Sequence, residues 1–460
     1  MRYRKERDVL GIVNIPADAY YGSETMRAYN NFQISGIKVS GELVHAYMIV
    51  KKAAASANMK IGKLDSRKGN AIIRACDMLL SGKHSENFVL DVFQAGAGTS
   101  INMNVNEVIA NVAIELLGGK KGNYRMVHPN DDVNMSQSTN DTMPTAMRIA
   151  TYFMIKRHLL PQMDALAASI DRKSREFKGI IKLGRTHLQD AVPIMLNEEF
   201  SSYLYAVKSS IDFVEEANAK MLKLPIGGTA VGTGINAGSE YKNAVIKEIR
   251  KLTGERFSLF PSPYGPMSNK LDELEVSASL RECATSLNKF ANDLRLLNSG
   301  PRGGINEIRL PAVQPGSSIM PGKINPSMAE MMNMVCFQVI GNDLVISEAA
   351  NAGQLELNVY MPVMIFNLLF SINILANGMK AFRERCVNGI TANDRRIKEN
   401  LQNDLSIATA LTPYIGYAKA ARIARKAFLE GKSVMQICIE MKVLDRKKLE
   451  KVLNPKNAVR

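Results

Sequence analysis

A seam of seven apolar residues at helical spacing constrains the fold of this chain more than any other feature. Its members follow one another at intervals of 4-3-4-3-4-3: Val276, Leu280, Cys283, Leu287, Phe290, Leu294 and Leu297. Side chains three and four positions apart share one face of a helix, so the pattern predicts a long helix with an apolar stripe. A stripe sustained over three heptads packs lengthwise against other helices. We therefore expect a bundle of long helices.

Helical periodicity also dominates the rest of the chain. Four more long patterns lie at 142–177, 198–222, 327–350 and 359–385, and shorter ones at 43–59, 68–81 and 106–117. Pro161 is expected to kink the first long helix. The sequence predicts an all-α fold with three parts: a helical N-terminal domain at 1–140, a central five-helix bundle domain at 141–392 and a small helical C-terminal domain at 393–460.

The chain is basic, with a formal net charge of +15. Its lysines and arginines are scattered over the predicted helical faces, with modest concentrations only at the two ends. Such a distribution is typical of a solvated basic surface rather than a nucleic-acid site. We expect no nucleic-acid partner, although an acidic small substrate would be attracted.

Cysteine usage and hydropathy favour a soluble cytoplasmic protein without a membrane partner. The five cysteines are widely spaced and form no Cys-x-x-Cys pair, which argues against disulfides and zinc clusters. No apolar region follows the charged N-terminus, so a secretory signal is not expected. The most apolar run, 361–376, contains Asn367, Ser371 and Asn373 and is interpreted as a buried helix.

Two polar loops precede predicted helices and could bind an anion. In the loop at 94–106, glycines allow backbone amides to turn toward a ligand, and Thr99 and Ser100 add hydroxyl donors. It lacks the Gly-Lys-Ser/Thr ending of a phosphate-binding loop. In the loop at 134–142, Ser138, Thr139 and Asn140 follow one another at a helix N-terminus, which stabilises anions. A helix cap would explain one of these three residues but not all of them.

A third loop, at 184–193, holds the histidine with the most promising neighbours. His187 follows Thr186 and precedes a glutamine and an aspartate, whereas His45, His84 and His158 lie in ordinary contexts and His128 lies in another polar loop. A single histidine is more often structural than catalytic. Its role therefore depends on the other loops.

The fourth loop, at 315–326, interrupts two long helical patterns with three prolines and two glycines. Asn325 and the following proline would suit a helix start, and Ser327 with Glu330 fits a capping box. That structural explanation does not account for Ser317, Ser318 and Lys323. We expect this loop to close over a small anionic substrate.

These loops together resemble the aspartase/fumarase superfamily. The resemblance rests on motifs in the same order along the whole chain: Tyr20-Tyr-Gly-Ser-Glu-Thr, Ala97-Gly-Thr-Ser, Gln137-Ser-Thr-Asn-Asp, Gly184-Arg-Thr-His, Gly232-Thr-Gly-Ile-Asn, Gly316-Ser-Ser-Ile-Met-Pro-Gly-Lys-Ile-Asn-Pro326 and Ile415-Gly-Tyr417. It implies an all-α homotetramer whose active sites each draw on three subunits. It implies a small dicarboxylate substrate and no required cofactor or metal, with activation by a divalent cation such as Mg²⁺ left open.

The resemblance also implies a role for each candidate residue. Ser317 corresponds to the base, as a serinate. Thr99, Ser138 and Thr139 correspond to the donors for the carboxylate that becomes an aci-carboxylate, with Ser100 and Ser318 beside them. Lys323 and Asn325 correspond to the anchor of the other carboxylate. Asn140 and His187 would hold the amino group near Thr186, with Glu330 orienting the histidine.

Within the superfamily the motifs favour aspartases, with class II fumarase as the alternative. Gly98-Thr-Ser100, Gln137-Ser-Thr139 and Gly353-Gln-Leu-Glu-Leu-Asn358 are similar to aspartases, which as carbon-nitrogen lyases convert aspartate to fumarate and ammonia. His128-Pro-Asn-Asp-Asp132 is more similar to class II fumarases. A structural, non-enzymatic relative is disfavoured because every catalytic position carries a competent residue.

Overall fold

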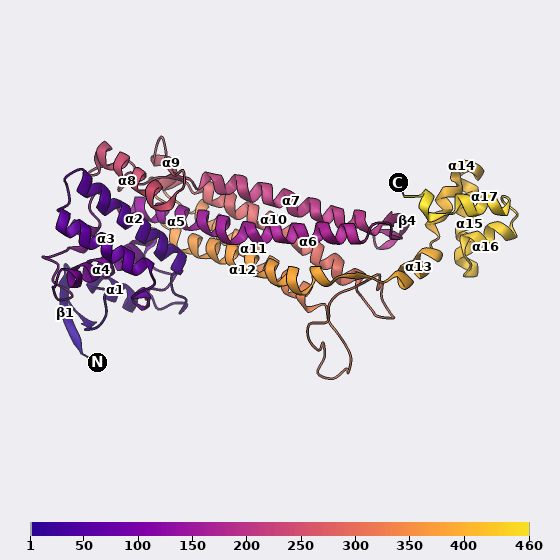
Figure 1. Cartoon of the computed structure of the whole chain (residues 1–460), viewed down its shortest axis with the longest axis horizontal. Helices are drawn as coiled ribbons and strands as arrows, with labels where there is room; N and C mark the ends of the chain where they lie inside the picture. Colours follow the sequence, from indigo (N-terminus) through magenta and orange to yellow (C-terminus); the bar gives the residue numbers. More distant parts are fainter. Residues whose placement is uncertain (1, 460) are drawn as a thin grey trace. The chain divides into compact units, whose positions relative to one another are not determined.

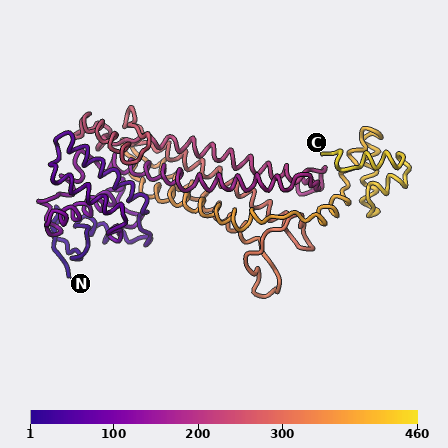
Figure 2. Tube along the Cα trace, in the orientation of Figure 1, coloured from indigo at the N-terminus to yellow at the C-terminus, as the bar shows by residue number. Residues whose placement is uncertain are grey.

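The computed structural model describes residues 2–459 and divides into two compact units, each assembled from three segments of the chain. The first unit comprises Met1–Pro161, Asp212–Glu282 and Gln338–Leu375; the second comprises Gln162–Ile211, Cys283–Phe337 and Ala376–Arg460. The chain therefore returns to each unit twice, and Figure 2 follows its course by colour from the N-terminus to the C-terminus. The division into three consecutive domains, at 1–140, 141–392 and 393–460, stays a prediction.

The predicted seam helix is present as α10, Leu271–Leu297 (Figure 1). All seven seam residues are buried. In the second unit, Phe290 of α10 packs with Phe200 of α7 (Leu196–Lys220) and Phe382 of α12 (Met361–Arg385), at ring-centroid distances of 6.4 and 5.6 Å. The apolar periodicity thus identified a bundle helix correctly.

The other long helices also match the sequence patterns. Besides α7 and α12 they include α11, Ser327–Asn351. The pattern at 142–177 becomes α5 (Thr139–Met154), a π-helical turn η4 (Ile155–Leu159) and α6 (Leu160–Glu176). Pro161 was expected to disturb this helix, and the disturbance is the π-helical turn just before it. Proline has no N–H to donate to the preceding turn. The all-α bundle prediction is confirmed.

Shorter helices build most of the first unit. They are α1 (Ser23–Asn31), α2 (Gly41–Lys60), α3 (Ser66–Leu80), α4 (Thr99–Leu116), α8 (Gly238–Thr253) and α9 (Tyr264–Ser268). The pattern at 106–117 underestimated α4, which starts at Thr99. Asn102, Asn104 and Asn106 are buried in α4 and obscured its apolar face.

Eight short strands form four two-stranded sheets that the sequence patterns did not reveal. The antiparallel pairs are β1 (Tyr3–Asp8) with β2 (Gly11–Pro16), β3 (Ile181–Thr186) with β4 (Gln189–Met195), and β7 (Ile308–Arg309) with β8 (Thr391–Ala392). The parallel pair is β5 (Lys223–Leu224) with β6 (Ser258–Leu259). None of them forms a layer of the core.

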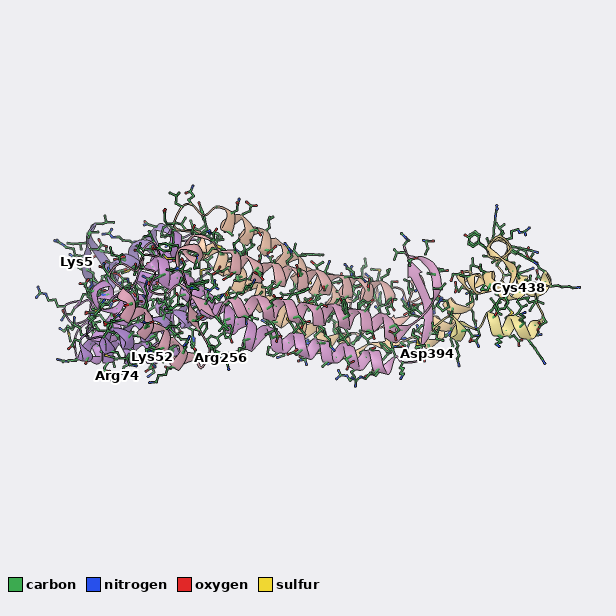
Figure 3. The ribbon with its side chains drawn as sticks, turned by 90° about the horizontal axis from the view of Figure 1, so that it is seen from above. Lys5, Lys52, Arg74, Arg256, Asp394 and Cys438 are labelled. Atoms are coloured by element: carbon green, nitrogen blue, oxygen red, sulfur yellow. The ribbon has the colours of Figure 1, made fainter. Side chains whose placement is uncertain are left out.

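The C-terminal helices of the second unit are α13 (Asp394–Gln402), α14 (Thr412–Ile415), α15 (Tyr417–Glu430), α16 (Val434–Glu440) and α17 (Arg446–Val452). Of these, α15, α16 and α17 surround a core of their own. Leu411, Ile423 and Leu449 are fully buried in that core, next to Cys438, which Figure 3 labels. The remaining helical turns are η1 (Ser85–Asn87), η2 (Gly96–Gly98), η3 (Pro129–Val133), η5 (Val387–Gly389), η6 (Ser406–Leu411) and η7 (Pro455–Asn457).

Within residues 2–459, one helical segment is long and apolar enough to cross a membrane, Met361–Gly389, which begins with α12. The sequence interpretation had placed this run below that threshold because of its polar residues. In the most apolar window of this segment, 67% of the residues are buried inside the protein. This burial is typical of the core helix of a bundle.

Candidate active site

Two of the four predicted loops meet in the first unit, at the N-termini of α4 and α5. Asn102 Nδ2 in the first turn of α4 donates a hydrogen bond to Thr139 Oγ1 at the start of α5, at 3.0 Å. Thr99 and Ser100 open α4, and Ser138 is the N-cap of α5. Both helices therefore direct free backbone amides and the positive ends of their dipoles toward neighbouring hydroxyl groups.

The start of α4 is held by contacts on both sides. Gln94 Oε1 accepts a hydrogen bond from the Ile101 amide at 2.8 Å, and the Ala97 amide donates to the Val359 carbonyl at 2.7 Å. Gly98 has φ +78°, and a Cβ there would lie 2.7 Å from Met143 Sδ. Only glycine meets both conditions without strain. This turn leaves Thr99 exposed while Ser100 is buried.

The start of α5 uses Ser138 as a cap, while the side chains of its two neighbours bond elsewhere. Ser138 Oγ accepts a hydrogen bond from the Asn140 amide at 3.2 Å, and the Asp141 carboxylate accepts one from the Ser138 amide at 3.0 Å. The capping interpretation of Ser138 is therefore confirmed. Asn140 Nδ2 instead donates to the Ala230 carbonyl at 2.8 Å, which ties α5 to the glycine-rich loop after α7.

The buried side chain of Asp141 binds the same glycine-rich loop. Its carboxylate accepts hydrogen bonds from the backbone amides of Gly227 and Thr229, both at 2.9 Å, and it is completely buried. Burial raises the pKa of Asp141 to about 6, while the hydrogen bonds from these amides and from Ser138 oppose the rise. The buried Asp141 carboxylate thus holds the start of α5 and the glycine-rich loop together.

Lys51 of α2 lies behind these donors, and the sequence patterns did not reveal it. Its Nζ donates to the side-chain oxygens of Asn102 and Asn134 at 2.8 Å and of Gln137 at 3.1 Å, and its exposed fraction is 0%. Burial lowers its pKa to about 7, against the opposing charge of Asp141. By accepting from Lys51, the oxygen of Asn102 leaves its amide to donate to Thr139.

His187 lies at the tip of the hairpin formed by β3 and β4 in the second unit. Thr186 and Gln189 pair across a two-residue turn in which His187 and Leu188 have φ of 54° and 59°. Positive φ at both positions is characteristic of a type I′ turn, where glycine or asparagine is usual. Thr186 and His187 are exposed, and within residues 2–459 the imidazole has no hydrogen-bond partner.

Ser317 sits in the long loop before α11, which we call the flap (315–326). Its hydroxyl oxygen accepts hydrogen bonds from the backbone amides of Ile319 and Met320 at 3.2 and 2.8 Å. Two amides directed at one oxygen favour a negative charge on it. Ser318 and Lys323 are exposed in the same loop, and Lys323 forms no ion pair in the described part of the chain.

Asn325 closes the neck of the flap rather than capping α11. Its Nδ2 donates to the Gly316 carbonyl at 2.7 Å, while the Gly316 amide donates to the Lys323 carbonyl at 2.8 Å. The capping box predicted from Ser327 and Glu330 is wrong. Helix α11 begins at Ser327 itself, whose buried hydroxyl has no hydrogen-bond partner among residues 2–459.

A buried ion-pair network supports the hairpin in the second unit. Arg185 of β3 binds Glu307 through two hydrogen bonds of 2.9 and 2.8 Å, and Lys182 lies 3.2 Å from the same carboxylate. Burial opposes ionisation of Glu307, but Arg185 and Lys182 together hold its pKa below the usual value. Glu307 precedes β7, which leads toward the flap. No hydrogen bond or ion pair among residues 2–459 joins Glu330 to His187.

The candidate residues therefore occupy three places. The starts of α4 and α5 bring together Thr99, Ser100, Ser138, Thr139 and Asn140; the hairpin tip carries Thr186 and His187; the flap and the helix after it carry Ser317, Ser318, Lys323, Asn325 and Glu330. No group of three or more His, Cys, Asp or Glu side chains suited to a metal ion occurs in the described residues.

Comparison with protein families assigns this arrangement. A family described as Lyase matches residues 11–341, and one described as Fumarase C C-terminus matches residues 407–460. The chain belongs to the aspartase/fumarase superfamily of lyases.

Relatives of this lyase include enzymes of both activities. It is 48% identical to an aspartate ammonia-lyase of Bacillus subtilis over 98% of this chain and 95% of the relative. It is 44% identical to a class II fumarate hydratase of the same organism over 100% and 99%. The superfamily is thus established, but overall similarity leaves the substrate open.

Solved structures agree with the fold of the lyase. A fumarate lyase:delta crystallin from Brucella melitensis superimposes with a TM-score of 0.95 at 47% identity, covering 99% of both chains. A class II fumarase from Schistosoma mansoni superimposes with a TM-score of 0.96 at 35% identity, covering 99% of this chain and 98% of that one.

Proposed function

We propose that this lyase is an aspartate ammonia-lyase, which reversibly converts L-aspartate to fumarate and ammonia. The observation that carries the proposal is the donor cluster where α4 and α5 begin. There Thr99 and Thr139 belong to Gly-Thr-Ser and Gln-Ser-Thr, the forms of these two motifs that resemble aspartases. Asn102 holds Thr139 in place by a hydrogen bond of 3.0 Å.

The second candidate function is that of a class II fumarase, which interconverts malate and fumarate. The segment from His128 to Asp132 favours it because this segment resembles fumarases. We weigh the segment less because it forms η3 and its preceding residue, where His128 Nδ1 accepts hydrogen bonds from the amides of Asn130 and Asp131. Its imidazole is thus used in shaping a turn.

The proposed reaction begins with removal of a weakly acidic proton from C3 of aspartate. The electron pair of the broken C–H bond moves into the neighbouring carboxylate, which becomes a doubly charged aci-carboxylate. Thr99, Ser138 and Thr139 would stabilise that charge, with Ser318 and buried Ser100 beside them. Preorganised donors of this kind contribute on the order of 10²- to 10³-fold each. The electron pair then forms the C2–C3 double bond as the C–N bond breaks and ammonia leaves.

Ser317 is the proposed base that accepts the C3 proton. A serine hydroxyl loses its own proton readily only where its anion is stabilised. The amides of Ile319 and Met320 that point at Ser317 Oγ supply such stabilisation. The ammonium of Lys323, six residues further along the same loop, adds a positive charge to the flap.

The remaining residues would bind the other ends of the substrate. Lys323 and Asn325 would anchor the second carboxylate, and Asn140 and His187 would hold the amino group near Thr186. Glu330 would orient His187 from a different subunit, since the two do not interact among the described residues of one chain. The proposal thus includes shared active sites in a homotetramer.

An exposed apolar stripe on α11 supports this assembly. Met334, Phe337 and Leu344 lie on one helical face and have exposed fractions of 62%, 58% and 62% in the single chain. Contiguous apolar surface of this kind marks a protein interface. The proposal requires no cofactor, leaves activation by Mg²⁺ open, and places the enzyme in the cytoplasm, where five buried free thiols would stay reduced.

The substrate assignment is tested by incubating purified lyase separately with L-aspartate and L-malate while fumarate absorbance is followed. We expect fumarate and an equal amount of ammonia from aspartate, and none from malate. Fumarate from malate alone would establish the fumarase alternative. Turnover of neither substrate would contradict both assignments.

A further inference from the structure

A cavity of about 480 Å³ lies in the first unit, away from the starts of α4 and α5. Parts of α2, α3, α5, η4 and α8 line it. Its volume is within the range of small-molecule sites. Phe153 in its wall lies fourteen residues beyond Thr139 along the same helix, which corresponds to about 20 Å. The cavity is therefore separate from the donors proposed to bind dicarboxylate.

The interior of the cavity is apolar. Ile49 of α2, Ile149 and Phe153 of α5, and Leu252 of α8 are among its lining residues. A dicarboxylate would have to place a charged group against these side chains without a partner, at a large cost in free energy. An aromatic ring or a branched hydrocarbon suits them instead.

The rim carries a cation without an ion-pair partner. Arg157 lies in η4 with its guanidinium carbon 3.9 Å from the centroid of the Phe153 ring, and within residues 2–459 it forms no ion pair or hydrogen bond. The nearby carboxylate of Glu255 is already engaged by Lys156 at 2.7 Å. Lys52, also on the rim and labelled in Figure 3, is paired with Asp77. Arg157 is thus available to an anion.

Two histidines stand beside that cation. His45 of α2 and His158 of η4 both line the cavity, and neither imidazole has a hydrogen-bond partner in the described residues. Burial and the charge of Arg157 lower the pKa of His45, whereas Glu42 opposes the shift. A neutral imidazole has one N–H group, which can donate a hydrogen bond to the carboxylate of a ligand.

The π-helical turn explains how α5 presents these groups. The Leu160 amide bonds to the Ile155 carbonyl, five residues back, so η4 holds one residue more than an α-helical turn. Turns of this type are frequent at functional sites. Arg157 and His158 both lie within it.

We propose that this cavity binds a small apolar monocarboxylic acid, with its ring or branched chain against Ile49 and Phe153 and its carboxylate at Arg157 and His45. The carboxylate of the acid forms an ion pair with the Arg157 guanidinium, and its apolar body fills the interior of the cavity. Nothing in this site depends on the proposed lyase reaction.

The proposal is tested by calorimetric titration of the full-length lyase with 3-phenylpropionate, in the presence of excess fumarate to occupy the proposed active site. We expect saturable binding of one acid per chain. Arg157→Gln should weaken it at least tenfold, because a charge-assisted hydrogen bond is lost. The matched control is Arg74→Gln, which removes an exposed arginine of α3 outside the cavity (Figure 3) and should leave affinity within twofold.

Location is tested with Phe153→Trp, which adds the single tryptophan of a chain that has none. Saturating 3-phenylpropionate should change its emission with the affinity that calorimetry finds for the same variant, and the neutral analogue 3-phenylpropanamide should bind at least tenfold more weakly. Absence of saturable binding, equal affinity of the amide, equal effects of Arg157→Gln and Arg74→Gln, or competition by fumarate would each overturn the proposal.

Discussion

Ser317 combines two features that a serine base needs. The Ser317 hydroxyl oxygen accepts hydrogen bonds from two backbone amides. The neck of the flap is closed by hydrogen bonds between Gly316 at one end and Lys323 and Asn325 at the other. The amides come from the same short turn, so this hydrogen-bonding geometry is local to the flap. If Ser317 is the base, as proposed, its activation would not depend on the rest of the site.

Replacing Ser317 separates this chemistry from the fold. Ser317→Ala should reduce turnover at least a thousandfold, because the proposed base is lost, while substitution of this partly exposed loop residue changes stability by less than about 0.5 kcal/mol. Initial rates of fumarate formation and thermal unfolding would measure the two effects. Ser318→Ala serves as the neighbouring control, with a smaller expected loss; near-normal activity of Ser317→Ala would remove Ser317 as the base.

Lys51 shows how a residue distant from substrate can determine which donors face it. The cation has three neutral oxygen partners and no carboxylate partner within hydrogen-bond distance among the described residues. It thereby fixes the orientation of the Asn102 amide and places a buried positive charge behind Thr139. Sequence reasoning missed it because a lysine in a helix is normally exposed, and its burial follows only from the packing of α2 against α4 and α5.

We predict that Lys51→Met lowers kcat/KM for aspartate at least tenfold, mainly through KM. The reason is the loss of hydrogen bonds from a charged group that orients Asn102. Lys52→Met changes the next residue of α2, which pairs with Asp77 near the surface, and should alter kcat/KM less than twofold. Steady-state kinetics of both variants decide the matter, and equal effects would contradict this role for Lys51.

Lys51 also predicts a dependence of stability on pH. Its pKa is about 7 in the folded lyase and 10.5 in the reference state, so between these values the unfolded chain binds more protons. The free energy of unfolding should therefore rise with pH in this window, by up to about 1.4 kcal/mol per pH unit. Urea unfolding of wild type and Lys51→Met across the window measures the difference. An identical slope in both proteins would contradict the shift.

The hairpin of β3 and β4 shows what periodicity cannot reveal at the scale of an element. Its strands contain lysine, glycine, arginine and proline, and its turn is His187-Leu188 instead of a glycine-containing pair, so neither the strand pattern nor the turn signal is present. The hairpin is supported by the ion pair between Arg185 and Glu307, two residues that are 122 positions apart in the chain. By contrast, α10 was predictable because its seven buried positions are all apolar and follow helical spacing in the sequence.

Leu188 is expected to strain the hairpin tip. It has φ 59° and an exposed fraction of 68%, although leucine disfavours this conformation and gains little there from burial. Leu188→Gly should raise the free energy of unfolding by about 1 kcal/mol. Val192→Gly, in the extended strand β4, should lower it by a similar amount. Denaturant unfolding of both variants tests this pair, and destabilisation by Leu188→Gly would show that the leucine makes favourable contacts in the assembled protein.

At the scale of the whole molecule, the stripe on α11 predicts assembly. Leu344→Glu would place a charge within the proposed interface, and its desolvation should dissociate the proposed tetramer into smaller species. Activity should fall with it, because each active site is proposed to need several subunits. Light scattering during gel filtration reports the mass. Phe428→Glu changes another exposed apolar residue, in α15, and should leave the mass unchanged. A tetrameric Leu344→Glu protein would exclude α11 from the interface.

The interleaving of the two units has a consequence for the birth of the protein on the ribosome. The first unit needs Gln338–Leu375, so its core cannot close until about four-fifths of the 460 residues have been synthesised. Until then α5 and α8 can already pack on α2, but the segment that completes the unit is missing. The nascent chain must therefore expose the apolar faces that Gln338–Leu375 covers in the finished protein. Growing chains of this length should engage chaperones, and pausing of synthesis before residue 338 should leave them sensitive to protease.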